Sequence, residues 1–352
     1  MPAIATVVAW ANSETIEQAK SALLAGRLVA FPTETVYGLG ADAANDRAVA
    51  TLYAAKERPT FNPLIAHVTD IAAARRLAQL DAEALKLAET FWPGPLTLVL
   101  AKQGNCPVGQ LATSGLNTIA VRVPSHPVAR SILSAFGKPV VAPSANRSGR
   151  VSPTSARHVQ ADLGGRIDLI VDGGATPLGI ESTILACLGT TVLLRPGSTP
   201  REAIEKCLGH DITVATRSPR AADDRARPLA PGMLISHYAP RALVRMNAVT
   251  VAPGEALLAF GTTLPEDAGN ARMVLNLSAR RDLVEAAGNL FSYLRELDDA
   301  GVDSIAVAPI PDEGLGEAIN DRLCHAAAPR HRGFLDDSTA AGELDTLRPG
   351  IT

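Results

Sequence analysis

Short apolar segments that end in polar residues constrain the fold of this chain more than any other feature. Four of them are typical of buried strands: residues 28–31, 96–101, 118–124 and 139–146. Helical patterns separate them, such as the run that begins near Asn45 and must stop before Pro59. Short strands alternating with helices indicate an α/β domain. The sequence therefore predicts a mixed α/β sheet extending to about residue 212.

The length of 352 residues favours two domains over one. From residue 242 onward the pattern becomes strand–helix–strand–helix, which predicts a smaller βαβ-type domain. The segment between them is rich in proline and lacks an apolar period, which is typical of a linker. Its "PGMLISHYAP" stretch has the composition of a segment that docks on a surface. We therefore predict a catalytic domain at 1–212, a docking linker at 213–241 and a small domain at 242–352.

The overall composition excludes several classes of protein. The chain has 33 basic and 36 acidic residues, a balance that argues against a general nucleic-acid coat. Its four cysteines form no C-x-x-C pair, which disfavours a zinc site and favours a reduced, cytoplasmic setting. Apolar runs stay shorter than the roughly 20 residues that span a bilayer. The apolar start reads as a first strand rather than a signal peptide.

The stretch "FPTETVYGLGADA" (31–43) contains a glycine pattern that resembles a dinucleotide-binding turn. Gly38, Gly40 and Ala43 give the spacing G-x-G-x-x-A. The acidic residue that would bind a ribose is Glu57, which stands between two cations at a predicted helix end. This context favours a small polar pocket over a nicotinamide cofactor. The chain also lacks the P-loop and G-x-S-x-G motifs.

Two cations, Lys56 and Arg58, lie two positions apart just before Pro59. In an extended segment both side chains would point the same way and could face one phosphate or carboxylate. The alternative is a solvated helix C-terminus, where the dipole favours cations. The spacing leaves both interpretations open.

Other polar residues follow predicted strands. Arg122 lies inside an apolar strand, which suggests either a bound carboxylate or a structural ion pair. The segment 143–149 ("PSANRSG") could hold a ligand or form an ordinary turn, and His67 could be a core histidine. Segments 179–184 and 193–198 repeat the pattern. Without an obvious nucleophile or metal cage, these residues suit an enzyme that binds anions and aligns substrates.

Taken in order, seven segments resemble the YrdC-like threonylcarbamoyl-AMP synthases: "FPTETVYGLGADA", "KERPTFNPL", "FWPGPLTLVL", "AVRVP", "APSANRSG", "GIESTI" and "LLRPGS". The later "APGMLISHYAP" and "GLGEAINDRL" are similar to the linker and second domain of the longer branch of that family. The resemblance extends from about residue 12 to about residue 330. It implies a twisted mixed sheet around a positively charged hollow, followed by a smaller Rossmann-like domain.

The resemblance also implies a reaction. A nucleotidyltransferase of this family joins L-threonine, bicarbonate or CO₂, and ATP into threonylcarbamoyl-AMP and pyrophosphate. Other proteins then transfer the threonylcarbamoyl group to the adenosine beside the anticodon of certain tRNAs. Expected partners are therefore these downstream transfer proteins, with tRNA itself a further candidate, and Mg²⁺ is expected to bind through the phosphates rather than through protein side chains.

Site residues carry over by the same resemblance. Lys56 and Arg58 are the expected catalytic cations. The residues expected to hold L-threonine are Thr35, His67, Arg122 and Ser182. The residues expected around ATP, besides Lys56 and Arg58, are Asn62, Thr118, Ser144, Asn146, Ser152, Arg195, His237 and Tyr238. Some relatives have basic residues after the Pro-Gly-Met of the linker, whereas this chain has Leu234, Ile235 and Ser236, so a charged role for that segment is not expected.

Three other classes compete with this interpretation. An RNA-binding module without catalysis would need a local basic patch that the near-neutral total charge conceals. A carbamoyl-transfer enzyme of the hydrogenase-maturation type would carry acylphosphatase and zinc-finger regions, which this sequence lacks. A nicotinamide-dependent enzyme is the most distant alternative.

Overall fold

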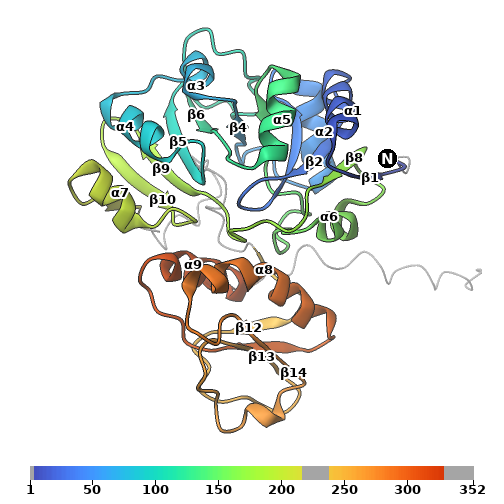
Figure 1. Ribbon diagram of the computed structural model, residues 1–352, viewed down its shortest axis with the longest axis vertical. Coiled ribbons are helices and arrows are strands. Elements are labelled where there is room, and N and C mark those ends of the chain that lie inside the picture. Colours follow the sequence, from blue (N-terminus) through green and yellow to red (C-terminus); the bar gives the residue numbers. More distant parts are fainter. Residues whose placement is uncertain (1–3, 216–237, 329–352) are drawn as a thin grey trace, which may run out of the picture.

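The computed structural model describes residues 4–215 and 238–328 and contains two β-sheets (Figure 1). Among these residues, the larger sheet has eleven strands in the order β1-β8-β2-β3-β7-β4-β6-β5-β9-β10-β11. Its strand pairs include both parallel and antiparallel ones, so the prediction of a mixed sheet is confirmed. The smaller sheet has four parallel strands in the order β12-β15-β13-β14.

The elements of the larger unit follow the predicted alternation closely. Its strands are β1 (Val7–Trp10), β2 (Val29–Pro32), β3 (Tyr37–Asp42), β4 (Ile65–His67), β5 (Leu96–Ala101), β6 (Thr118–Arg122), β7 (Val140–Val141), β8 (Leu169–Asp172), β9 (Thr183–Cys187), β10 (Thr191–Arg195) and β11 (Thr213–Val214). Its helices are α1 (Ser13–Leu24), α2 (Asp46–Lys56), α3 (Ile71–Leu77), α4 (Ala82–Phe91), α5 (Pro127–Phe136), α6 (Ala156–Leu163) and α7 (Arg201–Leu208).

Capping side chains explain where several of these helices begin. The side chains of Asn45 and Asp81 accept hydrogen bonds from the first turns of α2 and α4. Asn12, rather than Ser13, caps the first helix. Asn12 precedes the first helical residue and accepts from the backbone N–H of Thr15, which leaves Ser13 inside the helix.

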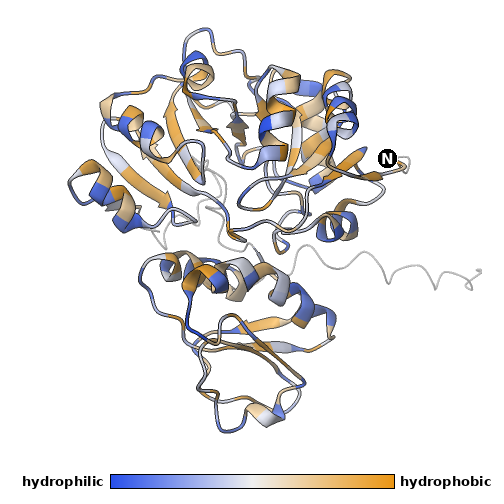
Figure 2. Cartoon of the chain, in the orientation of Figure 1, coloured by the Kyte–Doolittle hydropathy of each residue, from blue (hydrophilic) through white to orange (hydrophobic). Residues whose placement is uncertain are grey.

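Helices cover both faces of the larger sheet because side chains alternate along each strand. Val29 and Phe31 of β2 pack against α1 and α5, whereas Ala30 faces the cluster that contains α2 and α6. The hydropathy colouring shows the same division, with apolar strands inside and polar residues on the outer helix surfaces (Figure 2). The main core therefore lies on either side of the central strands.

The smaller unit packs two long helices on one face of its parallel sheet. The strands are β12 (Leu243–Arg245), β13 (Ala256–Ala259), β14 (Met273–Asn276) and β15 (Ser304–Val307), and a 3₁₀ turn, η1, spans Ala268–Asn270. The helices are α8 (Leu283–Asp299) and α9 (Leu315–Ala327). Both lie on the face of the sheet that is turned toward the larger unit (Figure 1). Helix α8 begins at Leu283 because Asp282 caps it.

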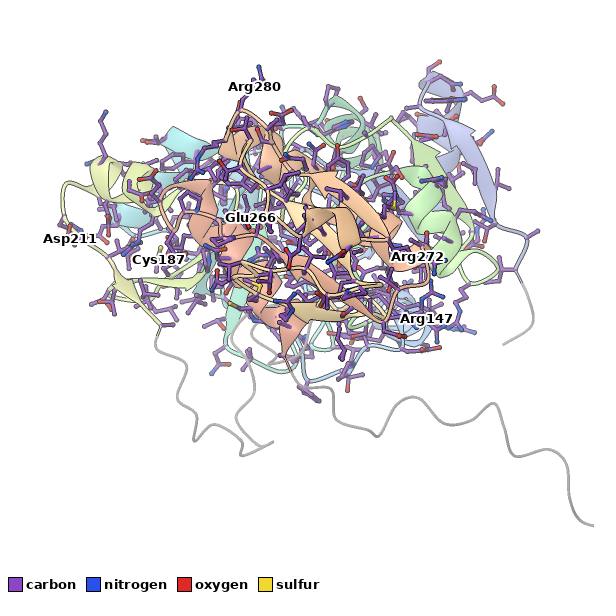
Figure 3. The ribbon with its side chains drawn as sticks, turned by 90° about the horizontal axis from the view of Figure 1, so that it is seen from below. Arg147, Cys187, Asp211, Glu266, Arg272 and Arg280 are labelled. Atoms are coloured by element: carbon purple, nitrogen blue, oxygen red, sulfur yellow. The ribbon has the colours of Figure 1, made fainter. Side chains whose placement is uncertain are left out.

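The two units meet through apolar and polar contacts, and Val36, Val151 and Ile180 of the larger unit belong to the same apolar cluster as the core residues of α8 and α9. The Thr154 hydroxyl lies 2.9 Å from that of Ser292 on α8, and Arg295 forms an ion pair of 2.7 Å with Asp162. Seen from the side of the smaller unit, that unit covers the middle of the larger one (Figure 3). Residues 216–237 of the expected linker lie outside the described residues, so the domain boundaries and the docking of the linker stay predictions.

No helix in the described ranges is long and apolar enough to cross a membrane.

Candidate active site

Strand register brings His67 and Arg122 together. Strands β4 and β6 are parallel neighbours, and His67 is the direct partner of Arg122 in their ladder. Side chains two residues apart on a strand lie on the same face of the sheet. His67 therefore shares a face with Ile65, and Arg122 shares the same face with Ala120. Those apolar residues belong to a small cluster that contains no helical residue within the described ranges. The two polar side chains thus stand at the end of a sheet face left open by the helices.

The adjacent strands add hydroxyl groups and a second arginine. The hydroxyls of Thr97 on β5 and Ser182 beside β9 are 2.8 Å apart. A register shift between Leu193 and Arg195 interrupts the pairing of β10 with β9. Arg195, only 5% exposed, donates from Nη2 to the Ser182 carbonyl at 2.8 Å. The bulge therefore brings a guanidinium close to a serine expected at the threonine site.

The polar loop between β2 and β3 contacts Arg122. Arg122 Nη2 donates to Glu34 Oε1 at 2.7 Å and to Thr35 Oγ1 at 3.0 Å. The second oxygen of Glu34 accepts from the Ser125 N–H at 3.1 Å. Burial raises the pKa of Glu34, but Arg122 outweighs this and holds it below its usual value. Arg122 therefore forms the structural ion pair that was one of the two alternatives expected from the sequence, and it also lines a cavity.

Of the two interpretations left open for the cations, the helix C-terminus is the one that the structure has, although Lys56 is buried there rather than solvated. Lys56 is the last residue of α2, and Glu57 adopts a left-handed conformation with φ of 53°. The Lys56 ammonium donates to the Ser144 and Asn146 carbonyls. Arg58 donates to the Pro63 carbonyl at 3.2 Å. Helix termination, rather than strand alternation, decides where these side chains point.

Burial affects the charges of both cations. Desolvation, with the nearby Arg58 charge, holds the pKa of Lys56 well below its usual range. Desolvation also lowers the pKa of Arg58 to about 10, so its guanidinium remains charged at neutral pH. Arg58 lines the cavity described below, whereas the Lys56 side chain lies behind the loop that contains Ser144.

An exposed ion-pair cluster ties the segment with Lys56 to the loop at 143–149. Arg147 lies at the rim of the molecule (Figure 3) and donates to Glu57 at 2.6 Å. Arg166 donates to the other oxygen of Glu57 at 2.7 Å. Inside the loop, the Asn146 amide donates to the carbonyls of Arg147 and Arg150. The loop is therefore an ordered turn, and its Asn146 Oδ1 is buried without a hydrogen-bond partner.

These elements enclose a cavity of about 40 Å³. Eight sequence-predicted residues line it together, from both expected ligand groups: Thr35, Arg58, His67, Arg122, Ser144, Ser182, Arg195 and Tyr238. The rest of the wall consists of Val36, Ile65, Ala142, Pro143 and Glu181. Three guanidinium groups thus face one carboxylate, an excess of positive charge that suits anionic ligands. Burial, with the Arg122 charge, lowers the pKa of His67 to about 3, so its imidazole is neutral.

Other predicted residues lie outside this cavity. Thr118 begins β6, four positions before Arg122 and roughly 13 Å away along the strand. Asn62 is buried, and its Oδ1 has no hydrogen-bond partner. Ser152 is fully buried and donates to Glu181 at 2.5 Å. His237 falls outside the described residues.

Two carboxylates were missed as functional residues. Glu34 supports Arg122, and Glu181 lines the cavity, yet sequence reasoning treated both only as parts of their motifs. Their positions within predicted strand-end segments were the available signal. No group of three or more potential metal-binding side chains was found among the described residues.

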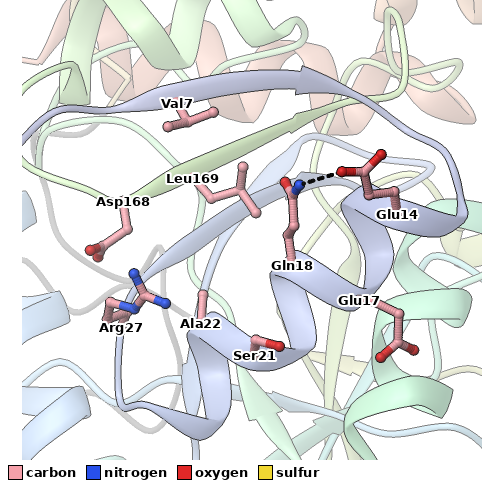
Figure 4. A pocket seen from close by; sticks show the side chains of 9 residues that line it. All are labelled: Val7, Glu14, Glu17, Gln18, Ser21, Ala22, Arg27, Asp168 and Leu169. Carbon is pink, nitrogen blue, oxygen red and sulfur yellow. Dashed lines mark hydrogen bonds between the residues drawn. The ribbon is translucent and has the colours of Figure 1, made fainter.

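A second hollow of about 440 Å³ lies between α1 and the edge formed by β1 and β8 (Figure 4). Its wall includes Glu14, Glu17 and Asp168 beside Arg27. None of the predicted site residues lines it, and acidic groups outnumber basic ones there. It is therefore poorly suited to a nucleotide.

Known proteins resemble this chain over most of its length. The Sua5/YciO/YrdC family model, described as "Telomere recombination", matches residues 21–197, and the model for the threonylcarbamoyl-AMP synthase C-terminal domain matches residues 199–328. A Bacillus subtilis protein named threonylcarbamoyl-AMP synthase is 42% identical over 332 residues, which cover 91% of this chain and 94% of the relative. The chain belongs to the threonylcarbamoyl-AMP synthase family.

Further members of the family support the assignment. The Pyrococcus abyssi threonylcarbamoyl-AMP synthase is 42% identical over 337 residues, covering 90% of this chain and 96% of the relative. The crystal structure of P. abyssi Sua5 complexed with L-threonine superposes with a TM-score of 0.80 at 39% identity, covering 92% of this chain and 97% of the other. The expected fold, with a second domain after the catalytic sheet, is confirmed by this match.

Proposed function

We propose that this protein is a threonylcarbamoyl-AMP synthase that converts L-threonine, bicarbonate or CO₂, and ATP into threonylcarbamoyl-AMP and pyrophosphate. The observation that carries the proposal is the convergence of Arg58, Arg122 and Arg195 on one cavity lined by small hydroxyl side chains. Family membership and the relative whose structure holds L-threonine support it. The activity makes the protein a nucleotidyltransferase that acts in tRNA modification.

The threonine end of the site consists of Thr35, His67, Arg122 and Ser182. Arg122 pairs with the substrate carboxylate, because its Nε is buried without a hydrogen-bond partner while Nη2 stays on Glu34. His67 stays neutral and therefore does not repel the substrate amine. The uncharged amine attacks the bicarbonate carbon, and loss of water leaves a carbamate.

The nucleotide end of the site contains Arg58, Ser144 and Arg195. The carbamate oxygen attacks the α-phosphate in line, the bond to the β-phosphate oxygen breaks, and pyrophosphate leaves. Negative charge grows on the phosphates during this step, so preorganised guanidinium groups stabilise the transition state. Lys56 acts beside them by fixing the loop whose carbonyls accept from its ammonium. Tyr238 lines the same cavity, whereas Asn62, Asn146 and Ser152 lie outside it and are assigned to the nucleotide by the resemblance to the family.

The cavity wall does not fit a protein-bound metal ion. Among the residues that the structure describes, Glu181 is the carboxylate that lines the cavity, and it already accepts from Arg322 and Ser152. Mg²⁺ therefore enters as part of the MgATP substrate, held by the phosphates.

Substrates require the wall to move. A volume of about 40 Å³ holds little more than one or two water molecules. Threonine and ATP are both larger, so the segment that carries Tyr238, or the loop at 143–149, must shift on binding. We place the reaction in the cytoplasm, where downstream proteins would transfer the threonylcarbamoyl group to tRNA.

Pyrophosphate release from ATP tests the proposal. The purified protein is assayed with bicarbonate and Mg²⁺, and L-threonine is compared with L-serine and with no amino acid. Release that depends on both threonine and bicarbonate supports the synthase. Absence of release from folded protein refutes it and favours the RNA-binding alternative, which salt-dependent tRNA binding then checks.

A further inference from the structure

An arginine of the smaller unit is completely buried where that unit meets the cavity. Arg322 on α9 has no exposed surface. Its Nε donates to Glu181 Oε2 at 2.8 Å, and its Nη1 donates to Asp321 at 2.6 Å. Its guanidinium carbon also lies 5.2 Å from the centre of the Tyr238 ring. Burying a charged guanidinium costs free energy unless the charge is paired. The complete burial of Arg322 therefore indicates a specific role inside the molecule.

Glu181 connects this arginine to the nucleotide end of the site. One oxygen accepts from Arg322 and the other from the Ser152 hydroxyl at 2.5 Å, while the residue itself lines the cavity. Burial would raise the pKa of Glu181, but Arg322 and Arg195 outweigh this and hold it below its usual value. The carboxylate is therefore ionised, and it is the negative group opposite the cavity's arginines.

The same face of the smaller unit also supports Tyr238. The Tyr238 ring stacks on Phe291 of α8 at a centroid distance of 5.6 Å and meets the edge of His325 of α9 at 6.0 Å. With the guanidinium of Arg322 on its face, the tyrosine is held by three groups of the smaller unit. Two cavity-lining residues, Glu181 and Tyr238, thus take their positions from α8 and α9.

We propose that Arg322 is a positioning residue for the nucleotide site, which holds the Glu181 carboxylate against Ser152 and away from the phosphates. The proposal rests on the proposed function, because the phosphates are those of ATP. Arg322 does not line the cavity and acts through Glu181 and Tyr238. Without it, Glu181 becomes an uncompensated buried anion in a site that must accept a polyanion.

The central test compares Arg322→Met with the double variant Arg322→Met/Glu181→Gln. A misplacement of about 1 Å in a substrate-positioning group can cost on the order of 10²-fold, so we expect kcat/KM for ATP to fall by about 10–100-fold in the single variant. Calorimetric affinity for L-threonine should change much less. The double variant should recover part of the loss, because it also removes the stranded carboxylate. Arg322→Lys keeps the positive charge but lacks the planar guanidinium that can form two parallel hydrogen bonds. Its kcat/KM for ATP should therefore lie between those of wild type and Arg322→Met.

The matched control is Glu317→Gln, which breaks another ion pair between the same helix and the larger unit, Arg201–Glu317 at 3.4 Å. This pair lies outside the cavity wall and is partly exposed, so the control should stay within about twofold of wild type. Equal losses in Glu317→Gln and Arg322→Met would mean that docking of the units alone matters, and would overturn the proposal. A double variant whose kcat/KM for ATP is no higher than that of Arg322→Met would also overturn the proposal.

The same set of variants distinguishes a loss of folding from a loss of function. Circular dichroism and thermal unfolding report whether Arg322→Met is folded; if it is not, Arg322→Lys and the double variant decide the comparison. Wild type without threonine-dependent pyrophosphate release would refute the proposed function. The calorimetric ATP affinities of wild type and Arg322→Lys would then still test the positioning role, and equal affinities would overturn it.

Discussion

Arg58 and Lys56 are buried cations with different surroundings. Arg58 reaches the cavity, whereas Lys56 is bound to two loop carbonyls. Loss of one charged donor at a site of growing negative charge typically reduces the rate by about 10²–10³, so we expect this loss of pyrophosphate release in Arg58→Ala. Lys56→Ala should show a comparable loss of pyrophosphate release, because the Lys56 ammonium binds the loop that contains Ser144.

The matched control for these variants is Arg147→Ala, which removes a neighbouring but exposed cation paired with Glu57. Its activity should remain within a few-fold of wild type, because surface ion pairs contribute about 0–1 kcal/mol. Activity within about tenfold of wild type in both Lys56→Ala and Arg58→Ala would contradict their assignment.

The pairing of Glu34 with Arg122 predicts a ligand-dependent stability change. Glu34→Gln keeps the shape but leaves the buried guanidinium without its anion, which typically costs about 3–5 kcal/mol. A threonine carboxylate would restore that charge balance. We therefore expect the variant to have a lower Tm, and L-threonine to raise its Tm more than it raises that of wild type. Equal shifts in thermal unfolding would argue against carboxylate binding by Arg122.

His67 predicts how stability depends on pH. Its pKa is about 3 in the folded protein, against an ordinary value of 6.5, so the unfolded chain binds the proton more tightly. This contribution is complete above pH 6.5 and is lost as the pH falls toward 3. Between pH 7 and pH 5, wild type should lose about 2 kcal/mol more unfolding free energy than His67→Gln. Parallel losses in denaturant titrations would refute a buried neutral His67.

At the scale of elements, strand ends and the turns beside them build the site. Gly197 follows β10, and a Cβ there would lie 2.4 Å from the backbone of Ser182 and Thr183. Gly197→Ala must therefore push the start of β9 away from its place. Overpacking of this kind costs roughly 1–3 kcal/mol, and displacement of Ser182 should weaken threonine binding.

Thermal unfolding and calorimetry with L-threonine measure both effects of Gly197→Ala. Gly104→Ala is the matched control, because its added methyl meets nothing within 4 Å. If Gly197→Ala bound threonine as wild type does, the close approach of these two loops would not position Ser182.

At the scale of the whole molecule, a single glycine allows the two units to approach. Gly179 has φ of 71°, and a Cβ there would lie 2.5 Å from the Ala287 carbonyl of α8. Gly179→Ala should separate α8 from the loop before β9 and so disturb Glu181 and Tyr238. We expect slower pyrophosphate release and a larger radius of gyration by small-angle scattering.

Gly288 lies on the other side of the same contact and supplies the control. A methyl on Gly288 would meet the Pro177 carbonyl at 3.7 Å, an ordinary contact. Gly288→Ala should therefore keep its activity and gain about 0.5–1 kcal/mol of helix propensity. Similar behaviour of the two variants would mean that close packing of the units is unimportant for catalysis.

The sequence by itself determined the alternation of strands and helices, the start of α2 near Asn45, and the family motifs. These are local properties, set by apolar periodicity and by side chains that bond their own backbone. Local information also marked part of the cavity wall, because His67 and Arg122 end apolar strands and Ser182 directly precedes one.

Only the tertiary structure decided which of these residues meet. Register between β4 and β6 placed His67 beside Arg122, and the packing of the end of α2 brought the Lys56 ammonium to the Ser144 and Asn146 carbonyls. The pairing of Arg322 with Glu181 joins residues 141 positions apart, and no local pattern encodes it. Charge balance in a buried site depends on distance and desolvation, which exist only once the two units have packed together.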